Sequence, residues 1–179
     1  MTYKQCLINT MTALSKYPEV IFIGYNVKYG HKFNGTLINV PDKKLLEMPV
    51  AENLIMGMAM GMALEGYCPI VCIERINFLW VCADAIINHL DKAKELGWPP
   101  LNVIIRTCVG TDKPLDPGCQ HKGDYTKVWG DLLAAPVKAI KTIDEIAPAY
   151  DEAYARSGPS MIVEYRELYD TPHPTHGVK

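Results

Sequence analysis

The segment from Leu54 to Leu64 contains only apolar residues and glycine. A helix formed by such a segment is hydrophobic on every side, so it must be buried all round by its own domain or by a partner. The segment is too short to cross a bilayer, which requires about 20 apolar residues. Pro49 suits the first position of this helix, because its missing N–H is not needed there. Glu52 then lies in the first helical turn, where a buried carboxylate is costly unless it is paired or performs chemistry.

The composition fits one domain of ordinary size. The chain has 179 residues, of which 49% are hydrophobic and 21% are charged, so it is neither disordered nor fibrous and can bury a substantial core. A net charge of −2 gives no reason to expect nucleic acid or an anionic membrane as a partner. The N-terminal sequence MTYKQC lacks the apolar core of a signal peptide, which predicts a cytoplasmic protein. The six irregularly spaced cysteines indicate reduced thiols rather than a disulfide framework.

Apolar segments of strand length alternate with helical patterns along the chain. We expect strands over 20–24, 36–40, 68–73, 101–105, 137–140 and 160–163, and helices over 5–16, 49–66, 77–96, 125–133 and 143–157. This alternation predicts an α/β fold, a three-layer α/β/α sandwich with a mostly parallel sheet, as a single domain over residues 1–179. Ligands of such sheets bind at the carboxyl ends of the strands, where long loops are expected after Gly24 and over 106–124. The tail from Tyr169 contains prolines and a glycine and is expected to be mobile.

Several motifs share their order and spacing with one known family. The sequence Pro-Val-Ala-Glu-Asn at 49–53 is followed by glycines at 57, 61 and 66, by an aromatic residue at 78, and by the loop pair Gln120-His121. Ser-Gly-Pro-Ser-Met-Ile-Val-Glu at 157–164 ends the series. The series resembles the pyrimidine-binding domain of transketolase-like thiamine-diphosphate enzymes, above all the beta subunit of 2-oxo-acid dehydrogenase E1 components and the middle domain of transketolases. The resemblance covers nearly the whole chain and implies the thiamine-diphosphate-binding fold of the pyrimidine-domain type.

The resemblance implies that Glu52 binds the aminopyrimidine ring nitrogen of thiamine diphosphate. A carboxyl group in a dry pocket tends to hold its proton, because desolvation disfavours the anion. Sharing that proton with the ring favours the imino form of the exocyclic amine, which generates the C2 ylide. The chemistry belongs to the cofactor, and the protein supplies orientation and this one hydrogen bond. The alternative interpretation is a carboxylate that only complements the helix dipole.

Other side chains match the family less sharply. Phe78 matches the aromatic residue that stacks on the pyrimidine, although a core phenylalanine at a strand-to-helix turn would look the same. His121 matches a loop histidine that faces the reacting carbon or the substrate, and a histidine is a suitable acid or base near neutral pH. A solvated loop histidine is the alternative. The sequence leaves the roles of His31, in the loop after the first strand, and of Cys119, the one thiol near His121, open.

The sequence carries no motif for the charged end of the cofactor. No CxxC pair is present and no metal site is expected in this chain. The family's diphosphate site needs Gly-Asp-Gly followed by Asn, whereas Gly123-Asp124 and Gly130-Asp131 lack the third glycine and no Asn follows Asn102. The resemblance therefore implies a separate partner subunit that bears the Gly-Asp-Gly…Asn motif and holds Mg²⁺ and the diphosphate.

These observations predict the pyrimidine-binding subunit of a split transketolase-like or 2-oxo-acid dehydrogenase-like enzyme. Such a subunit would cleave or form a C–C bond next to the carbonyl of a 2-oxo acid or ketose, within an α2β2 heterotetramer of two-fold symmetry. The apolar helix after Glu52 is the expected contact surface, because Gly57 and Gly61 would let another backbone come close. A non-catalytic assembly or regulatory subunit with the same fold is the main alternative, and a stand-alone flavodoxin-like binding module is the third. The family's acidic residues after the first strand are replaced here by Tyr25 and Asn26.

Overall fold

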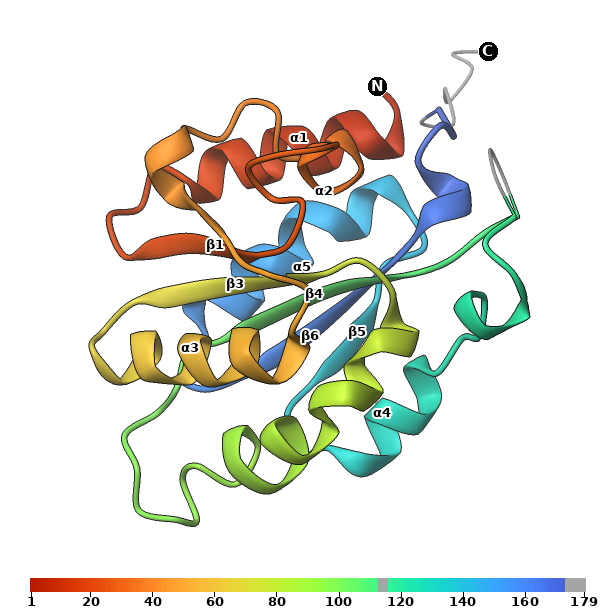
Figure 1. Cartoon of the computed structure of the whole chain (residues 1–179). Coiled ribbons are helices and arrows are strands. Elements are labelled where there is room, and N and C mark those ends of the chain that lie inside the picture. Colours follow the sequence, from red (N-terminus) through yellow and green to blue (C-terminus); the bar gives the residue numbers. More distant parts are fainter. Residues whose placement is uncertain (113–115, 173–179) are drawn as a thin grey trace.

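Six parallel strands form the central sheet in the computed structural model, which describes residues 1–112 and 116–172. The strands stand in the order β2-β1-β3-β4-β6-β5 (Figure 1). Their bounds are β1 Val20–Gly24, β2 Leu45–Glu47, β3 Cys68–Ile73, β4 Ile104–Val109, β5 Val137–Ala139 and β6 Ser160–Tyr165. Parallel neighbours require crossover connections, which the helices between the strands provide.

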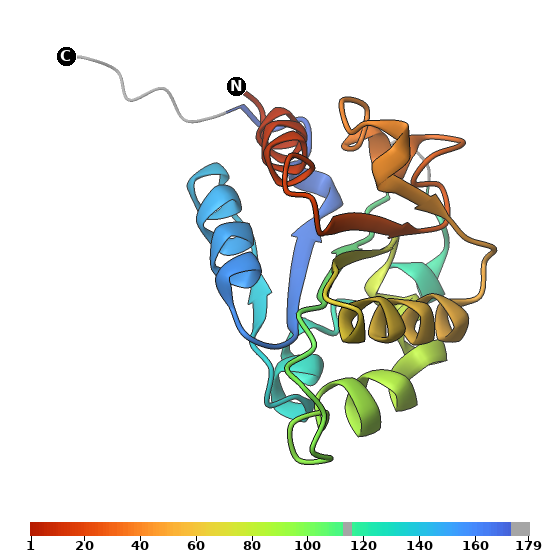
Figure 2. The same ribbon diagram turned by 90° about the vertical axis from the view of Figure 1, so that its left-hand side faces the viewer.

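Helices cover both faces of the sheet (Figures 1 and 2). One face carries α1, Tyr3–Leu14, and α5, Ile143–Ala155, and the other carries α3, Glu52–Leu64, and α4, Thr126–Leu132. Shorter helical segments are α2 Lys32–Gly35, η1 Asp42–Lys44, η2 Ile76–Cys82, η3 Ala85–Leu90, η4 Cys119–His121 and η5 Arg166–Leu168. A separate hydrophobic cluster fills each side of the sheet. The predicted three-layer α/β/α sandwich with a mostly parallel sheet is therefore confirmed.

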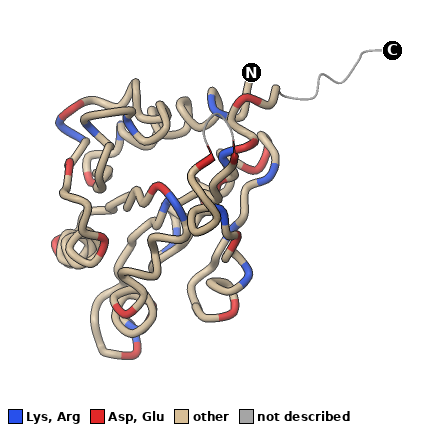
Figure 3. Tube along the Cα trace, turned by 45° about the vertical axis from the view of Figure 1, so that its right-hand side comes forward, with Lys and Arg blue, Asp and Glu red and all other residues tan. Residues whose placement is uncertain are grey.

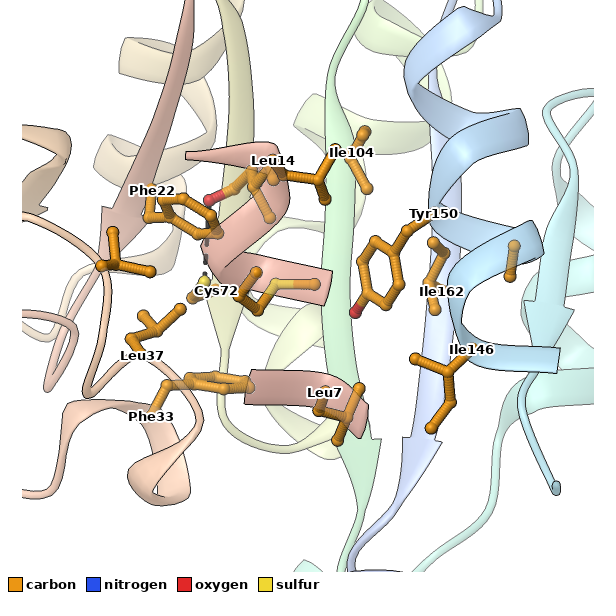
Figure 4. Close-up of a cluster of buried hydrophobic side chains, with 14 of the residues drawn as sticks. Leu7, Leu14, Phe22, Phe33, Leu37, Cys72, Ile104, Ile146, Tyr150 and Ile162 are labelled. Atoms are coloured by element: carbon orange, nitrogen blue, oxygen red, sulfur yellow. Dashed lines mark hydrogen bonds between the residues drawn. The ribbon is translucent and has the colours of Figure 1, made fainter. Parts of the chain in front are cut away.

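The core explains why the apolar runs became strands. All six residues of β3 are buried, as expected for a strand covered on both faces. Figure 4 shows side chains from α1, β1, β4, α5 and β6 meeting in one of the two clusters, with Leu7, Phe22, Ile104, Tyr150 and Ile162 among them. Each fully buried leucine, isoleucine or phenylalanine side chain contributes about 1.5–3 kcal/mol.

The second predicted strand, over 36–40, is wrong. These residues form turns, and the edge strand is instead β2, whose Leu45 pairs with Phe22 of β1. Lys44 helps to fix this edge, because its buried ammonium group donates to the carbonyl oxygens of Tyr17, Pro18 and Val20 at 2.7, 2.7 and 3.1 Å. The position of β2 thus depends on the contacts of Lys44 with the residues around the start of β1, which local sequence patterns do not predict.

The helix expected over 77–96 is irregular rather than continuous. It divides into the 3₁₀ segment η2, the π-helical segment η3 and turns up to Gly97. Leu79, Cys82, Ile86 and Leu90 are all buried against the sheet. The irregular helical turns keep these four side chains facing the sheet.

Two element boundaries differ from those expected. The helix starts at Glu52 instead of Pro49, because Ala51 has non-helical backbone angles and the N–H of Met48 donates to the carbonyl of Gly24 at 2.8 Å. The strand expected over 101–105 begins at Ile104 and continues to Val109. It therefore carries Arg106 into the core, where the sequence predicted the start of a loop.

The tail expected from Tyr169 is anchored at its beginning. Tyr169 is fully buried, and the N–H of Lys4 donates to its carbonyl at 3.0 Å. An antiparallel bridge between Thr2 and Pro172 then ties the two ends of the described chain together. Residues 169–172 are thus held by these contacts, and 173–179, the rest of the expected tail, lie outside the described residues.

Charged residues of both signs are interspersed along the chain trace (Figure 3). Of the helices that the structure describes, none has the length and apolar character needed to span a membrane.

Candidate functional site

A carboxylate at the end of β2 holds the loop that follows β1. Glu47 accepts hydrogen bonds from the backbone N–H groups of Asn26, Lys28 and Tyr29 at 2.6, 2.7 and 3.2 Å. Hydrogen bonds to an ionised group are roughly twice as strong as neutral ones. Glu74, directly after β3, accepts another from the Asn26 side-chain amide at 2.8 Å. Together the two carboxylates fix this loop at the carboxyl edge of the sheet.

His31 belongs to the same bracing network. Its Nδ1 accepts a hydrogen bond from the backbone N–H of Asn34 at 2.9 Å, and its Nε2 lies 2.9 Å from Oε1 of Glu74. A ring nitrogen that accepts carries no proton, so the proton lies on Nε2 and points to the carboxylate. Both ring nitrogens are therefore engaged in holding the loop, and the structure gives His31 a bracing role.

The end of this loop has an unusual backbone. Lys32, Phe33 and Asn34 all have positive φ angles, 47°, 46° and 56°, and each such non-glycine residue costs on the order of 1–3 kcal/mol. The Phe33 ring offsets part of this, because it is fully buried with the Arg106 guanidinium 4.5 Å from its centroid. The strained backbone is thus held in place by the core beneath it.

Glu52 is the first residue of α3 and is buried, with only 7% of its surface exposed. Among the residues that the structure describes, no basic side chain forms an ion pair with it. Burial and the Glu52 carboxylate raise the pKa of the Cys82 thiol, at the end of η2, to about 12. The helix that begins at Glu52 packs against η2, the segment that bears Phe78.

Phe78 and His121 come together although 43 positions separate them in the numbering. Their ring centroids are 5.3 Å apart in an edge-to-face arrangement, and both residues are partly exposed. Nδ1 of His121 lies 2.9 Å from the carbonyl oxygen of Pro117. A carbonyl oxygen only accepts, so Nδ1 carries the proton and Nε2 remains available as a base or acceptor.

The His121 segment rests directly on its neighbours. Nη1 of Arg75 donates to the His121 carbonyl oxygen at 3.3 Å. A Cβ atom added to Gly110 would lie 2.3 Å from that same oxygen, so only a glycine lets the chain after β4 pass so close. The histidine is therefore positioned by backbone packing as well as by the ring contact with Phe78.

The outer side of α3 is apolar and open. Ile55, Met56, Ala59 and Ala63 are buried in the core, whereas the other side forms a shallow groove lined by Asn53, Leu54, Gly57, Met58, Gly61, Met62, Glu65 and Tyr67. Leu54, Met58 and Leu64 are each more than two-fifths exposed. The helix is thus covered by its own domain on one side only.

Cys119 lies in η4, the same short segment as His121. It is exposed, and its thiol donates to the neighbouring Gln120 side chain at 3.8 Å. Within the described residues, no group of three or more histidine, cysteine, aspartate or glutamate side chains is placed to hold a metal ion. Cavities of about 220 and 280 Å³ lie next to Arg156, near the amino ends of β5 and β6, and contain none of the predicted site residues.

Sequence reasoning missed three contributors to the site. Glu47 and Glu74 hold the loop after β1, and Tyr25 adds a buried phenol whose pKa is raised by burial and by the carboxylates of Glu52 and Glu74. The only sequence signal was the replacement of acidic residues by Tyr25 and Asn26. The partners of the two glutamates are mostly backbone N–H groups or loop side chains, which no spacing reveals.

Comparison with known proteins agrees with this architecture. The family described as transketolase, pyrimidine binding domain, matches residues 2–172. The beta subunit of the mitochondrial pyruvate dehydrogenase E1 component from Chaetomium thermophilum is 24% identical over 167 residues, which cover 90% of this chain and 43% of the relative. Its counterpart from Saccharomyces cerevisiae is 24% identical over 176 residues, covering 94% and 48%. The chain thus spans less than half the length of these two relatives.

Among solved structures, a split gene transketolase, an inactive beta4 tetramer, superposes with a TM-score of 0.74. Its sequence is 16% identical, and the match covers 97% of this chain and 53% of that one. At this identity the likeness shows the fold alone.

Proposed function

Since this chain belongs to the family of transketolase pyrimidine-binding domains, we propose that it is the pyrimidine-binding subunit of a two-chain, thiamine-diphosphate-dependent enzyme. The observation that carries the proposal is Glu52, a buried acid without a basic partner among the described residues, next to a partly exposed aromatic segment. A buried carboxyl group needs a partner, and a ring nitrogen of the cofactor would provide one.

The residues present fit the pyrimidine end of the cofactor. Glu52 would bind the ring nitrogen, the Phe78 ring would stack on the pyrimidine, and Nε2 of His121 would exchange a proton with the substrate. Thiamine diphosphate, when bound, supplies the carbon nucleophile needed to cleave or form a C–C bond next to a carbonyl. A 2-oxo acid or a ketose is the proposed substrate class.

The residues present do not fit the diphosphate end. The sequence lacks the Gly-Asp-Gly…Asn motif, and no cluster of metal-ligating side chains occurs in the described part of the chain. We therefore assign Mg²⁺ and the diphosphate to a partner subunit, in an α2β2 assembly. The similarity to an inactive beta4 tetramer is compatible with a chain that needs a partner to be active.

Reconstitution tests the proposal. Mixed with a chain that carries the Gly-Asp-Gly…Asn motif, this protein should form a stable complex, and thiamine diphosphate with Mg²⁺ should bind to the complex but not to either chain alone in calorimetric titration. Equal binding by the isolated chain would contradict the two-chain site. Absence of binding by a well-formed complex would favour an assembly or regulatory subunit.

The outer side of α3 is the proposed contact surface, and its glycines allow a clean test. A Cβ added at Gly57 or Gly61 meets no atom within 4 Å, so leucine fits the isolated chain at either position. Each change should raise stability by roughly 0.5–1 kcal/mol, because glycine is a poor helix former. The same side chains should block a closely packed partner and reduce complex formation at least tenfold in analytical ultracentrifugation.

Asp151→Leu, at an exposed position of α5 on the opposite face, is the matched control and should leave association unchanged. If Gly57→Leu and Gly61→Leu associate as the parent chain does, α3 is not the contact surface.

A further inference from the structure

We propose that a groove between α5 and the end strand of the sheet, β5, binds a small carboxylate with an apolar body, which Arg156 and Ser160 hold. The groove is a cavity of about 280 Å³ near the amino ends of β5 and β6. Phe78 and His121 instead follow the carboxyl ends of β3 and β4. The inference is therefore separate from the proposed function, and neither depends on the other.

The groove exists because α5 carries small side chains where it packs against β6. Ala149 and Ala153 lie one helical turn apart on its buried side, and both line the groove. Ile162 of β6 lines it too and belongs to the hydrophobic cluster beside α5 (Figure 4). Ligand pockets have volumes from about 300 Å³ upward, mostly apolar walls and a few polar groups. The volume of this groove therefore suits a compact ligand.

Ser160 supplies a hydroxyl group without a partner in the groove. It is the first residue of β6, two positions before Ile162, so its side chain faces the same side of the sheet, toward α5. Ser160 lines the groove and is 4% exposed, and its Oγ makes no hydrogen bond with another described residue. A buried hydroxyl left unpaired is costly, and most buried polar side chains have a partner. An acceptor atom on a ligand would provide one.

Arg156 supplies the charge. It directly follows α5, is exposed, lines the groove and makes no ion pair with a described carboxylate. The other cation at the groove, Lys138 of β5, is already neutralised, because its Nζ lies 2.9 Å from Oε2 of Glu152. The pKa of the Glu152 carboxyl is lowered mainly by Lys138 and to a smaller extent by Arg156. The Lys138–Glu152 pair is exposed and takes no part in the proposed contacts.

These features together define the class of ligand. The apolar walls favour a hydrocarbon or aromatic body. The planar guanidinium of Arg156 matches the two oxygens of a carboxylate, and the Ser160 hydroxyl would donate to one of them. A phosphate group carries up to about two negative charges at neutral pH, which a single uncompensated cation balances less well. A monocarboxylate therefore fits best.

Benzoate is a suitable probe, because it joins one carboxylate to one apolar ring. Titrated into the ¹⁵N-labelled chain, it should shift the backbone amide resonances around Ala153 and Ser160 along a saturable one-to-one curve. Benzyl alcohol, which has the same ring but no charge, should bind about tenfold more weakly or less. The proposal is overturned if benzoate does not saturate by about 10 mM, if benzyl alcohol binds equally well, or if the shifts gather around Phe78.

Two variants test the assigned residues. Arg156→Gln should weaken benzoate binding about tenfold or more, and Ser160→Ala about threefold or more. Lys127→Gln, which removes an exposed cation on α4, should leave the affinity unchanged. Because the hydroxyl has no partner in the free chain, Ser160→Ala should not lower the midpoint of urea unfolding. Parental affinity in Arg156→Gln, or a destabilised Ser160→Ala chain, would contradict the assignment.

Discussion

Glu52→Gln is expected to reduce turnover of the reconstituted enzyme by about a hundredfold to ten-thousandfold, the range of a lost acid–base contact. Glutamine has the same size, so the buried start of α3 should keep its packing. An amide cannot hold and release the proton that a carboxyl group would share with the pyrimidine nitrogen. The measurement is steady-state turnover at saturating thiamine diphosphate, with complex formation checked by ultracentrifugation.

The matched control lies on the opposite face of the sheet. Glu152→Gln also removes one carboxylate, but Glu152 is exposed on α5, away from the proposed contact surface. It should leave turnover unchanged. If Glu52→Gln were as active as Glu152→Gln in an intact complex, the chain would be an assembly or regulatory subunit with the fold of an enzyme.

Arg106→Met should lower the free energy of unfolding by about 3–5 kcal/mol, because it leaves a buried carboxylate without its cation. The Nε and Nη2 atoms of Arg106 donate to the two oxygens of Glu164 at 2.7 and 3.1 Å, and both side chains are fully buried. The hydroxyls of Tyr150 and Tyr169 also donate to Glu164, and Nη2 donates to Thr36 at 2.8 Å. The pair thus connects β4, β6, α5, the loop after β1 and the start of the tail.

Urea denaturation of two further variants separates the buried charge from the lost side chain. Arg106→Met combined with Glu164→Gln should be more stable than Arg106→Met alone, because no unpaired buried charge remains and the single amide oxygen still accepts from one of the two phenols. Lys127→Met breaks the exposed pair with Asp131 at 2.6 Å and should have almost no effect. A loss of less than 1 kcal/mol for Arg106→Met would mean that this network contributes little to stability.

The strands were predictable where the buried run is continuously apolar. The apolar runs at Val20–Gly24 and Cys68–Ile73 were correctly predicted as strands, because burial on both faces of the sheet requires a continuous run of hydrophobic residues. The charge of Arg106 led the sequence analysis to end β4 too early. A charge after an apolar run indicates a strand end unless its partner is known, and Glu164 lies 58 positions later.

The site was only partly predictable. Local patterns place Glu52 at a helix start and His121 in a loop, but the contact between His121 and Phe78 depends on how the loop after β4 returns to η2. That return is set by the close passage of Gly110 under the His121 carbonyl, a long-range contact. Residue types and spacing therefore indicated the chemistry, and tertiary packing determined which residues meet.

The hydrogen bond between Glu52 and the cofactor ring can be measured directly. Thiamine diphosphate labelled with ¹⁵N at the pyrimidine ring nitrogen would be bound to the reconstituted complex, and its resonance recorded with the parent chain and with Glu52→Gln. We expect the parent complex to show the nitrogen in its hydrogen-bonded, partly protonated form, and the variant to show it displaced toward free cofactor. Identical resonances in the two complexes would contradict the role assigned to Glu52.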